Sequence, residues 1–200
     1  MFWPSPRWDE VTYWALDLET GGLDWRSDAV LAVGMVPIRG GTIRLGEAFQ
    51  SLVRPGPDRG FSADAVRAHQ LVPGDLAAAP PLAEVLRAVD ALLDGDVLLV
   101  HQAAIDVRFL TQAHRVAGLR WRRPRVVDTV ELLLKDTRKR RFIDPDAHQA
   151  DPTLNLSAAR ERLGLPDYGA HDALTDAVAA AELFLVLRRR LGARTLRELR

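Results

Sequence analysis

The stretch Tyr13-Trp14-Ala15-Leu16-Asp17-Leu18-Glu19-Thr20-Gly21 alternates between apolar and other side chains, and it decides the fold. Successive side chains of an extended strand point to opposite faces of the sheet. Trp14, Leu16 and Leu18 then share one face, whereas Ala15, Asp17 and Glu19 share the other. We therefore expect a strand from Tyr13 to Glu19 whose two carboxylates project the same way.

Two further strands are expected directly after this one. The run Ala29 to Ile38 is mostly apolar, which is typical of a central strand, and Gly40-Gly41 gives a hairpin signal before Thr42 to Val53. Because a short turn joins neighbouring strands in the antiparallel sense, the sequence predicts a three-stranded antiparallel meander.

The rest of the chain is expected to alternate helices with short strands. Ser62 is predicted to cap a short helix that ends near His69. Further helices are predicted over 82–93, 105–116, from about 129, 155–163 and 173–191, and strands over 96–101 and 125–128. Asp136 to Pro152 has two prolines and no clear period, so it is interpreted as a surface loop. This order predicts an α/β fold, a mixed sheet of the meander plus two further strands, flanked by helices.

The composition limits the class of protein. A chain of 200 residues with 48% hydrophobic residues can bury one substantial core, so we expect a single domain over 1–200. The 27 basic and 27 acidic residues cancel, so a nucleic-acid partner would depend on local basic patches and metal ions. The absence of cysteine excludes disulfides and thiolate metal ligands.

The sequence carries no membrane or export signal that we recognise. The first residues lack a basic stretch followed by an apolar run, so no signal peptide is expected. No uncharged apolar segment approaches the roughly 20 residues needed to span a bilayer. We expect a cytoplasmic protein with no membrane partner, and the sequence leaves its oligomeric state open.

Four acids and one histidine recur in three separated contexts: Asp17 and Glu19, then Asp106 after His101-Gln102-Ala103, then His171 and Asp176. Four carboxylates that converge in one fold cannot all stay ionised unless cations lie between them. Two metals roughly 4 Å apart can activate water on one side of a phosphodiester and stabilise the departing oxygen on the other. The sequence therefore predicts a divalent metal site built from hard oxygen ligands.

His171 differs from the acids in kind. If His171 and Asp176 lay in one regular helix, the five-residue separation would turn them about 140° apart. Both can face one site only if His171 lies in a loop or first turn, and the preceding Tyr168-Gly169 favours a loop. Neighbouring cations disfavour protonation of an imidazole, which suits a base that accepts a proton from water. We therefore interpret His171 as a general base rather than a metal ligand.

These residues resemble the motifs of the DEDDh, or DnaQ-like, 3′-to-5′ exonuclease family, which includes proofreading epsilon subunits of bacterial DNA polymerase III and several RNA-trimming enzymes. The similarity covers a core of about 13–187. It implies a ribonuclease H-like fold, two Mg²⁺ or Mn²⁺ ions, and release of nucleoside 5′-monophosphates from a free 3′ end. Carried over motif by motif, it makes Asp17, Glu19, Asp106 and Asp176 the metal ligands and His171 the base.

The resemblance also suggests which residues contact the terminal nucleotide. By motif match these are Thr20, Gly21, Leu23 and His69, with Gln102 near the second motif. The family usually has His-Asn-Ala where this chain has His101-Gln102-Ala103. The longer amide removes no metal ligand, and we expect it to shift the contacts near the second motif. His69 is read with equal weight as a histidine that merely ends a helix.

Several functions remain open at this stage. The leading hypothesis is an exonuclease acting on single-stranded or frayed DNA 3′ ends in proofreading or repair. An RNA-trimming enzyme of the same fold, a non-catalytic exonuclease-like module docking on a polymerase or DNA, and an unrelated α/β domain are the alternatives. Any DNA polymerase partner would associate noncovalently, since the sequence shows no polymerase domain.

Other polar residues have simpler interpretations. We expect Asp128 and Asp172 to be helix N-caps and His101 to be structural. Two basic runs are candidates for holding a phosphate backbone. They are Lys135, Arg138, Lys139, Arg140 and Arg141, and the run Arg120, Arg122, Arg123 and Arg125.

Overall fold

The computed structural model describes residues 5–200 apart from 58, 61 and 170 and the segment 145–150. Its centre is a six-stranded sheet with the order β3-β2-β1-β5-β6, in which β4 also pairs with β2. The strands are β1 (Tyr13–Thr20), β2 (Val30–Arg39), β3 (Thr42–Ile43), β4 (Phe49–Leu52), β5 (Val97–Val100) and β6 (Arg125–Asp128). β2 runs antiparallel to β1, whereas β5 and β6 run parallel to it, which confirms the predicted mixed sheet.

The third strand of the meander differs from the prediction. Instead of one strand from Thr42 to Val53, β3 and β4 are separate pieces that both pair with β2. A short 3-10 helix, Leu45–Glu47, lies between them. The break contains Gly46, which weakens strand structure because it brings no side chain to pack.

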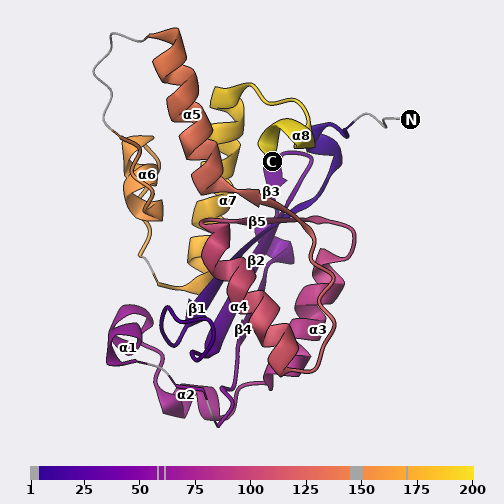
Figure 1. Cartoon of the computed structure of the whole chain (residues 1–200), viewed down its shortest axis with the longest axis vertical. Coiled ribbons are helices and arrows are strands. Elements are labelled where there is room, and N and C mark those ends of the chain that lie inside the picture. The colour runs from indigo at the N-terminus through magenta and orange to yellow at the C-terminus, as the bar shows by residue number, and fades with distance from the viewer. Residues whose placement is uncertain (1–4, 58, 61, 145–150, 170) are drawn as a thin grey trace.

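Helices cover both faces of the sheet (Figure 1). They are α1 (Ala63–His69), α2 (Pro73–Ala77), α3 (Leu82–Leu93), α4 (Ala103–Val116), α5 (Thr129–Ile143), α6 (Leu156–Arg162), α7 (Ala173–Leu191) and α8 (Leu196–Leu199), with a 3-10 helix at Trp8–Glu10. The bounds of α3 and α7 are those predicted, and Ser62 caps α1 by accepting a hydrogen bond from the Ala65 N–H. The short helices α2 and α8 were not predicted.

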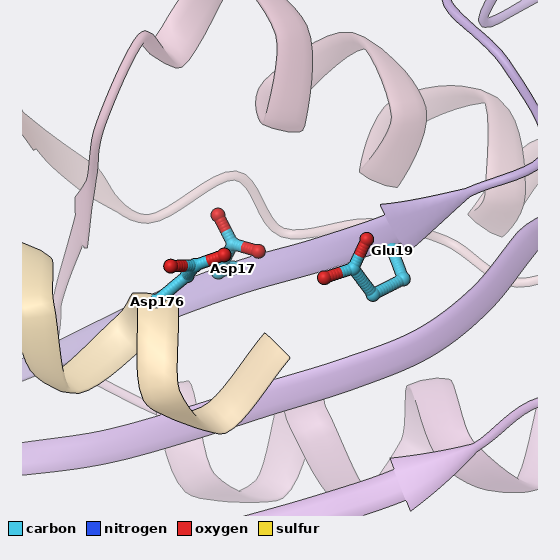
Figure 2. A group of neighbouring side chains, drawn as sticks. All are labelled: Asp17, Glu19 and Asp176. Atoms are coloured by element: carbon cyan, nitrogen blue, oxygen red, sulfur yellow. The ribbon is translucent and has the colours of Figure 1, made fainter. Parts of the chain in front are cut away.

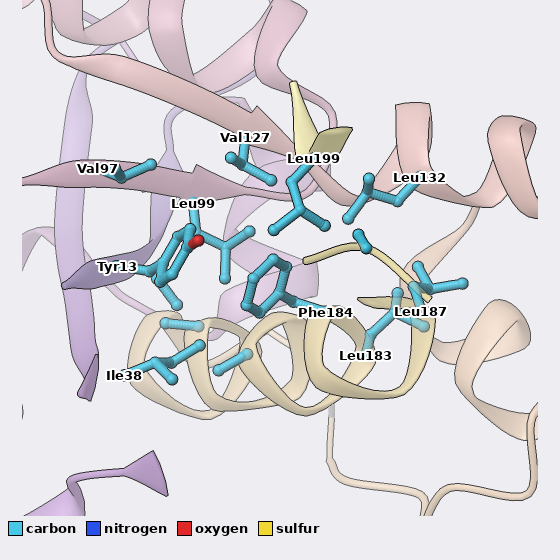
Figure 3. Packing of buried hydrophobic residues seen from close by; sticks show 14 of the residues in the cluster. Tyr13, Ile38, Val97, Leu99, Val127, Leu132, Leu183, Phe184, Leu187 and Leu199 are labelled. Atoms are coloured by element: carbon cyan, nitrogen blue, oxygen red, sulfur yellow. The ribbon is translucent and has the colours of Figure 1, made fainter. Parts of the chain in front are cut away.

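The two faces of the sheet carry separate cores. Tyr13 and Ala15 of β1 pack with α5, α6, α7 and α8, and Figure 3 shows Tyr13 beside Phe184 of α7. Trp14, Leu16 and Leu18 pack on the opposite face with α3 and α4, as the alternation predicts. Asp17 and Glu19 therefore project from the α7 side of the sheet.

One prediction about the second half of the chain is wrong. Asp136 to Ile143 forms the last turns of α5 rather than part of a loop. Asp136 is buried, and its carboxylate pairs with Arg140 one turn later and with Arg190 of α7. The polar residues that made this segment resemble a loop thus form ion pairs within α5 and between α5 and α7. The middle of the expected loop, 145–150, lies outside the described residues.

Among the helices in the part of the chain that the structure describes, none is both long enough and apolar enough to cross a bilayer.

Candidate active site

Three of the predicted acids meet at one point. Asp17 and Glu19 project from β1 and Asp176 from the first turn of α7, and each offers an oxygen within 4.8 Å of the other two (Figure 2). These three residues come from segments more than 150 positions apart in the sequence. The fold therefore assembles the cluster that the alternation of β1 predicted.

A glycine seats α7 directly on the sheet beside Asp17. Gly34 of β2 is the Cα partner of Asp17 in the β1–β2 ladder. A Cβ placed on Gly34 would lie 2.2 Å from the carbonyl carbon of Ala173 and from the nitrogen of Leu174. Because only a bare backbone fits there, the start of α7 can approach the sheet closely enough for Asp176 to meet Asp17.

The N-terminus of α7 is fixed by two further contacts. Asp172 caps the helix, as predicted, by accepting hydrogen bonds from the N–H and the Oγ1–H of Thr175. Its other carboxylate oxygen accepts from Gln50 Nε2 of β4 at 3.0 Å. The cap is thereby tied to the sheet.

His171 lies in the loop just before this cap, as its spacing from Asp176 requires. Its backbone has a φ of 71°, in the left-handed region that L-residues rarely adopt. The backbone N–H of His171 donates to Asp176 Oδ2 at 2.9 Å, and the residue is exposed to solvent. One side of Asp176 is thus held by the residue that carries the expected base.

Asp106 stands behind the cluster. It is buried in the first turn of α4, and its charge helps to raise the pKa of Asp17. It does not join the group whose oxygens all lie within 4.8 Å. The structure therefore brings the fourth acid to the edge of the cluster rather than into its centre.

The start of α4 is held by Asp128, a function that the sequence did not reveal. Asp128 Oδ1 accepts from the Gln102 N–H at 3.0 Å and Oδ2 from the Ala103 N–H at 2.8 Å. Oδ1 also accepts from the Val130 N–H and so caps α5, as predicted. A single carboxylate thus joins the helix that bears Asp106 to β6 and α5.

His101 is structural, as expected. Its Nδ1 lies 2.7 Å from Thr129 Oγ1, and its Nε2 lies 2.7 Å from the Leu154 carbonyl oxygen. Burial lowers the pKa of His101. The imidazole therefore links the end of β5 to α5 and to the segment before α6.

Burial and mutual repulsion raise the pKa values of the acids. Burial, followed by the charges of Asp106 and Asp176, raises the pKa of Asp17 well above its ordinary value. Burial and Asp176 raise the pKa of Glu19 to about 7, and burial raises the pKa of Asp106 to about 8. Burial also raises the pKa of Asp176. Without cations, the site therefore favours protonated carboxyls near neutral pH.

The donor set fits a divalent cation. Glu19 is buried, and its Oε1 has no hydrogen-bond partner within the described structure. An orphaned carboxylate oxygen beside two further carboxylates is costly unless a cation satisfies it. Hard oxygen ligands of this kind suit Mg²⁺ and Mn²⁺.

The comparison with protein families decides the assignment. The family described as Exonuclease (RNase_T) matches residues 14–184, a range that includes every acid of the cluster and His171. The chain belongs to this exonuclease family. The match confirms the DnaQ-like resemblance inferred from the motifs.

Curated relatives of this exonuclease include proteins named for DNA polymerase III. A DNA polymerase III subunit epsilon-like protein of Rhodobacter capsulatus is 35% identical over 191 residues, which is 94% of this chain and 25% of that protein. A DNA polymerase III PolC-type protein of Thermotoga maritima is 30% identical over 177 residues, 88% of this chain and 12% of that protein. The chain thus spans a quarter or less of the length of these two relatives.

Solved structures support the fold. A zinc-bound complex of E. coli ExoI with single-stranded DNA has a TM-score of 0.74 at 17% identity, and the alignment covers 91% of this exonuclease and 41% of that chain. The cell-death related nuclease 4 (CRN-4) has the same TM-score and identity over 94% of this chain and 66% of that one. These neighbours confirm the ribonuclease H-like architecture.

Two of the residues expected to contact a terminal nucleotide, Gly21 and His69, lie near the end of β1. The Gly21 carbonyl accepts from the Ser62 N–H at 2.7 Å, which ties β1 to the start of α1. That helix ends at His69, a buried residue whose charge interacts with His171 and whose pKa burial lowers. Two independent segments thus bring His69 and His171 near the end of β1.

The other three predicted contacts differ in exposure. Thr20 ends β1, and its hydroxyl donates to the Gly22 carbonyl at 2.7 Å. Leu23 is 84% exposed in the loop that follows β1. Gln102 is exposed at the start of α4 with a φ of 72°. Thr20 and Leu23 thus follow Glu19 closely in the chain, and Gln102 precedes the helix that carries Asp106, so their contacts with a nucleotide stay a prediction.

The basic run on α5 does not form a free phosphate-binding face. Lys135 Nζ donates to the carbonyls of Glu198 and Arg200, and Lys139 Nζ to those of Arg190 and Leu191. Arg140 pairs with Asp136 and Arg141 with Asp151, while Arg138 donates to a carbonyl of its own helix. This run mainly holds α5 against the C-terminal segment.

Proposed function

We propose that this exonuclease is a metal-dependent 3′-to-5′ enzyme that releases nucleoside 5′-monophosphates from DNA 3′ ends, in proofreading or repair. The observation that carries the proposal is the convergence of Asp17, Glu19 and Asp176 oxygens within 4.8 Å, with the buried Asp106 beside them. Crowded acids of this kind destabilise a fold, so they are typical of functional sites.

The residues divide into two groups by chemistry. Asp17, Glu19, Asp106 and Asp176 would hold two Mg²⁺ or Mn²⁺ ions, which when bound would activate a water and neutralise charge on the scissile phosphate. Thr20, Gly21, Leu23, His69 and Gln102 would hold the terminal nucleotide. Because these residues come from β1, α1, α4 and α7, the fold would orient the strand end against the acids.

His171 would act as the general base. It would accept a proton from the water that attacks the terminal phosphorus. The bond from phosphorus to the 3′ oxygen of the preceding nucleotide would break, and that oxygen would take a proton from solvent to become the new 3′-hydroxyl. Because His171 is exposed, substrate can reach its imidazole. The hydrogen bond from its backbone N–H to Asp176 holds the backbone from which the side chain extends.

DNA is the preferred substrate in this proposal. The names of two relatives refer to DNA polymerase III, and one structural neighbour is a complex of E. coli ExoI with single-stranded DNA. An exoribonuclease is the alternative. DNA and RNA oligonucleotides of identical sequence would separate them, since only the 2′-hydroxyl differs.

The test compares two labelling positions on one oligonucleotide. With Mg²⁺ or Mn²⁺, a 5′-labelled single strand should shorten stepwise, whereas a 3′-labelled strand should release labelled mononucleotide at once. Asp17→Asn should abolish both, and His171→Gln should slow them by about 10²–10⁴-fold. Glu161→Gln, an exposed acid on α6 outside the cluster, is the matched control and should leave the rate unchanged.

The outcomes discriminate between the candidate functions. Release of mononucleotide from the 5′ end would refute the polarity. No hydrolysis with either metal would favour a non-catalytic module that docks on a polymerase or DNA. Full activity of Asp17→Asn would refute the site.

The wider setting belongs to the same proposal. We propose that residues 1–200 act as one exonuclease domain with a core of about 13–187, in the cytoplasm. A DNA polymerase would bind it noncovalently. Copurification of a polymerase with the tagged chain from a cytoplasmic extract, lost on high salt, is the expected result.

A further inference from the structure

The second arginine run differs from the run on α5. Arg120, Arg122 and Arg123 are exposed, and within the described structure none has a side-chain hydrogen bond or ion pair. They line a hollow of about 660 Å³ together with Trp121 and Arg125, between the end of α3 and the segment that leads from α4 to β6. These three guanidinium groups are therefore available to an external acceptor.

Acids on the other wall of the hollow are largely engaged. Asp90 Oδ1 lies 3.1 Å from His114 Nε2, and Asp96 Oδ2 accepts from Trp14 Nε1 at 3.2 Å. Asp94 is exposed and has no such partner in the described part of the chain, whereas the Asp90 side chain, which is 37% exposed, is already paired with His114. Uncommitted positive charge thus exceeds uncommitted negative charge.

A stripe of polar side chains runs along the solvent-facing side of α4, from the end of the helix that carries Asp106 toward the segment that carries the arginines. Arg108, Thr111, Gln112 and Arg115 follow the spacing that places side chains on one face of a helix. Arg108 and Arg115 are exposed and, in the described part of the chain, also lack a side-chain partner. Asp106, on the buried face of the same helix, marks the end nearest the active site.

The helix has a suitable length and direction. α4 starts where β5 ends, beside the acids, and its other end leads into the arginine loop next to α3 (Figure 1). Its 14 residues span about 21 Å at 1.5 Å per residue. One strand of a duplex carries a phosphate about every 3.4 Å, and an extended single strand spaces them more widely, so this length matches a few phosphates.

We propose that Arg108, Arg115, Arg120, Arg122 and Arg123, here called the α4 track, bind the phosphate backbone of the strand upstream of the reacting 3′ end. The inference rests on the proposed exonuclease function and adds the path of the substrate. Arginines that contact phosphates position a strand without reading its sequence. The chain has no net charge, so a local track of this kind would supply the attraction that the whole molecule lacks.

The test measures binding and hydrolysis separately. In the triple variant Arg115→Glu, Arg122→Glu, Arg123→Glu, a labelled single-stranded oligonucleotide should bind more weakly, measured by anisotropy over a KCl series in an Asp17→Asn background. The slope of log K against log salt should become shallower by about 0.7 for each lost phosphate contact, about 2 in all. With the active site intact, kcat/KM should fall for a long oligonucleotide and stay unchanged for a dinucleotide, which cannot reach the track.

A matched control removes the effect of total charge. Arg44, Arg189 and Arg197 are exposed and, as described, have no side-chain partner, so their triple replacement by Glu changes the net charge equally. Equal affinities and slopes for the two triple variants would overturn the proposal. The arginines would then be candidates for binding an acidic protein segment instead. A wild type that binds through the track but hydrolyses nothing would instead refute the proposed function.

Discussion

Gly34 and Asp17 are direct partners across the β1–β2 ladder, and the glycine leaves the space that the first turn of α7 occupies. The acid on one strand and the missing side chain on the next therefore act together. One supplies an oxygen to the cluster, and the other lets Asp176 reach it.

Gly34→Ala should separate Asp176 from Asp17. The added methyl would lie 2.2 Å from the α7 backbone, which has no flexible side chain to move aside. We expect a loss of about 1–3 kcal/mol in the free energy of unfolding and a larger loss of exonuclease activity than this destabilisation explains. Thermal melts and rates at a temperature where the variant stays folded would measure both.

Gly46→Ala is the control for this change. Gly46 lies outside the left-handed region, and a Cβ there meets nothing within 4 Å. Its stability should change by less than about 0.5 kcal/mol. If Gly34→Ala kept full activity, the seating of α7 on Gly34 would not matter for the site.

Stability without metal should fall as the pH rises. The pKa values of Glu19 and Asp106 are raised to about 7 and about 8 in the folded protein, so the folded state binds protons more tightly than the unfolded state. The sign follows: stability is highest below the unfolded pKa values near 4 and is lost progressively up to about pH 8. Thermal melts in EDTA from pH 5 to pH 8, with Asp106→Asn giving a shallower slope, would check this.

Divalent cations should reverse that loss. At a free metal concentration of 100 times Kd, one bound ion should raise the free energy of unfolding by about 2.7 kcal/mol. This corresponds to a rise of about 5–10 °C in Tm for a chain of this size. Mn²⁺ should raise Tm more at pH 8 than at pH 5, because protons compete for the same oxygens. An equal shift in Asp17→Asn would mean that the ion binds elsewhere.

The sequence predicted the parts of the site that depend on local pattern. The alternation of β1 placed Asp17 and Glu19 on one face, and the five-residue spacing placed His171 before the helix of Asp176. Both arguments need only the geometry of one strand or one helix. They held because β1 keeps a regular register with β2 from Tyr13 to Glu19, and because α7 begins only at Ala173, after His171.

Features that depend on contacts between distant segments were not predicted. The continuation of α5 to Ile143 rests on Asp136 lying between Arg140 and Arg190, and the second function of Asp128 rests on N–H groups of another helix. Considered without its distant partners, Asp136 is a typical polar loop residue. The partner on α7 that makes it a buried ion pair lies 54 residues away.

Gln102→Asn should stabilise the protein. Gln102 has a φ of 72°, in a region where asparagine is enriched among non-glycine residues, and asparagine is the residue the family resemblance leads us to expect. We expect a gain of up to about 1 kcal/mol, since relief of backbone strain is of that order. Glu at the same position should give no gain. A drop in Tm for Gln102→Asn would show that the glutamine side chain contributes more than its backbone costs.

Asp128→Asn should impair the site more than the fold. In Asp128, one carboxylate oxygen accepts from the Gln102 N–H and the other from the Ala103 N–H. Asparagine replaces one of these oxygens with an NH₂ group, so one of the two hydrogen bonds is lost. The start of α4 should loosen and displace Asp106, which should lower activity by about 10–100-fold and raise the Mn²⁺ concentration needed for thermal stabilisation. Asn155→Ala is the matched control, because it removes the N-cap of α6, where Asn155 Oδ1 accepts from the Ala158 N–H, at a similar cost of about 1 kcal/mol. If both variants lost the same stability and the same activity, Asp128 would be no more than a helix cap.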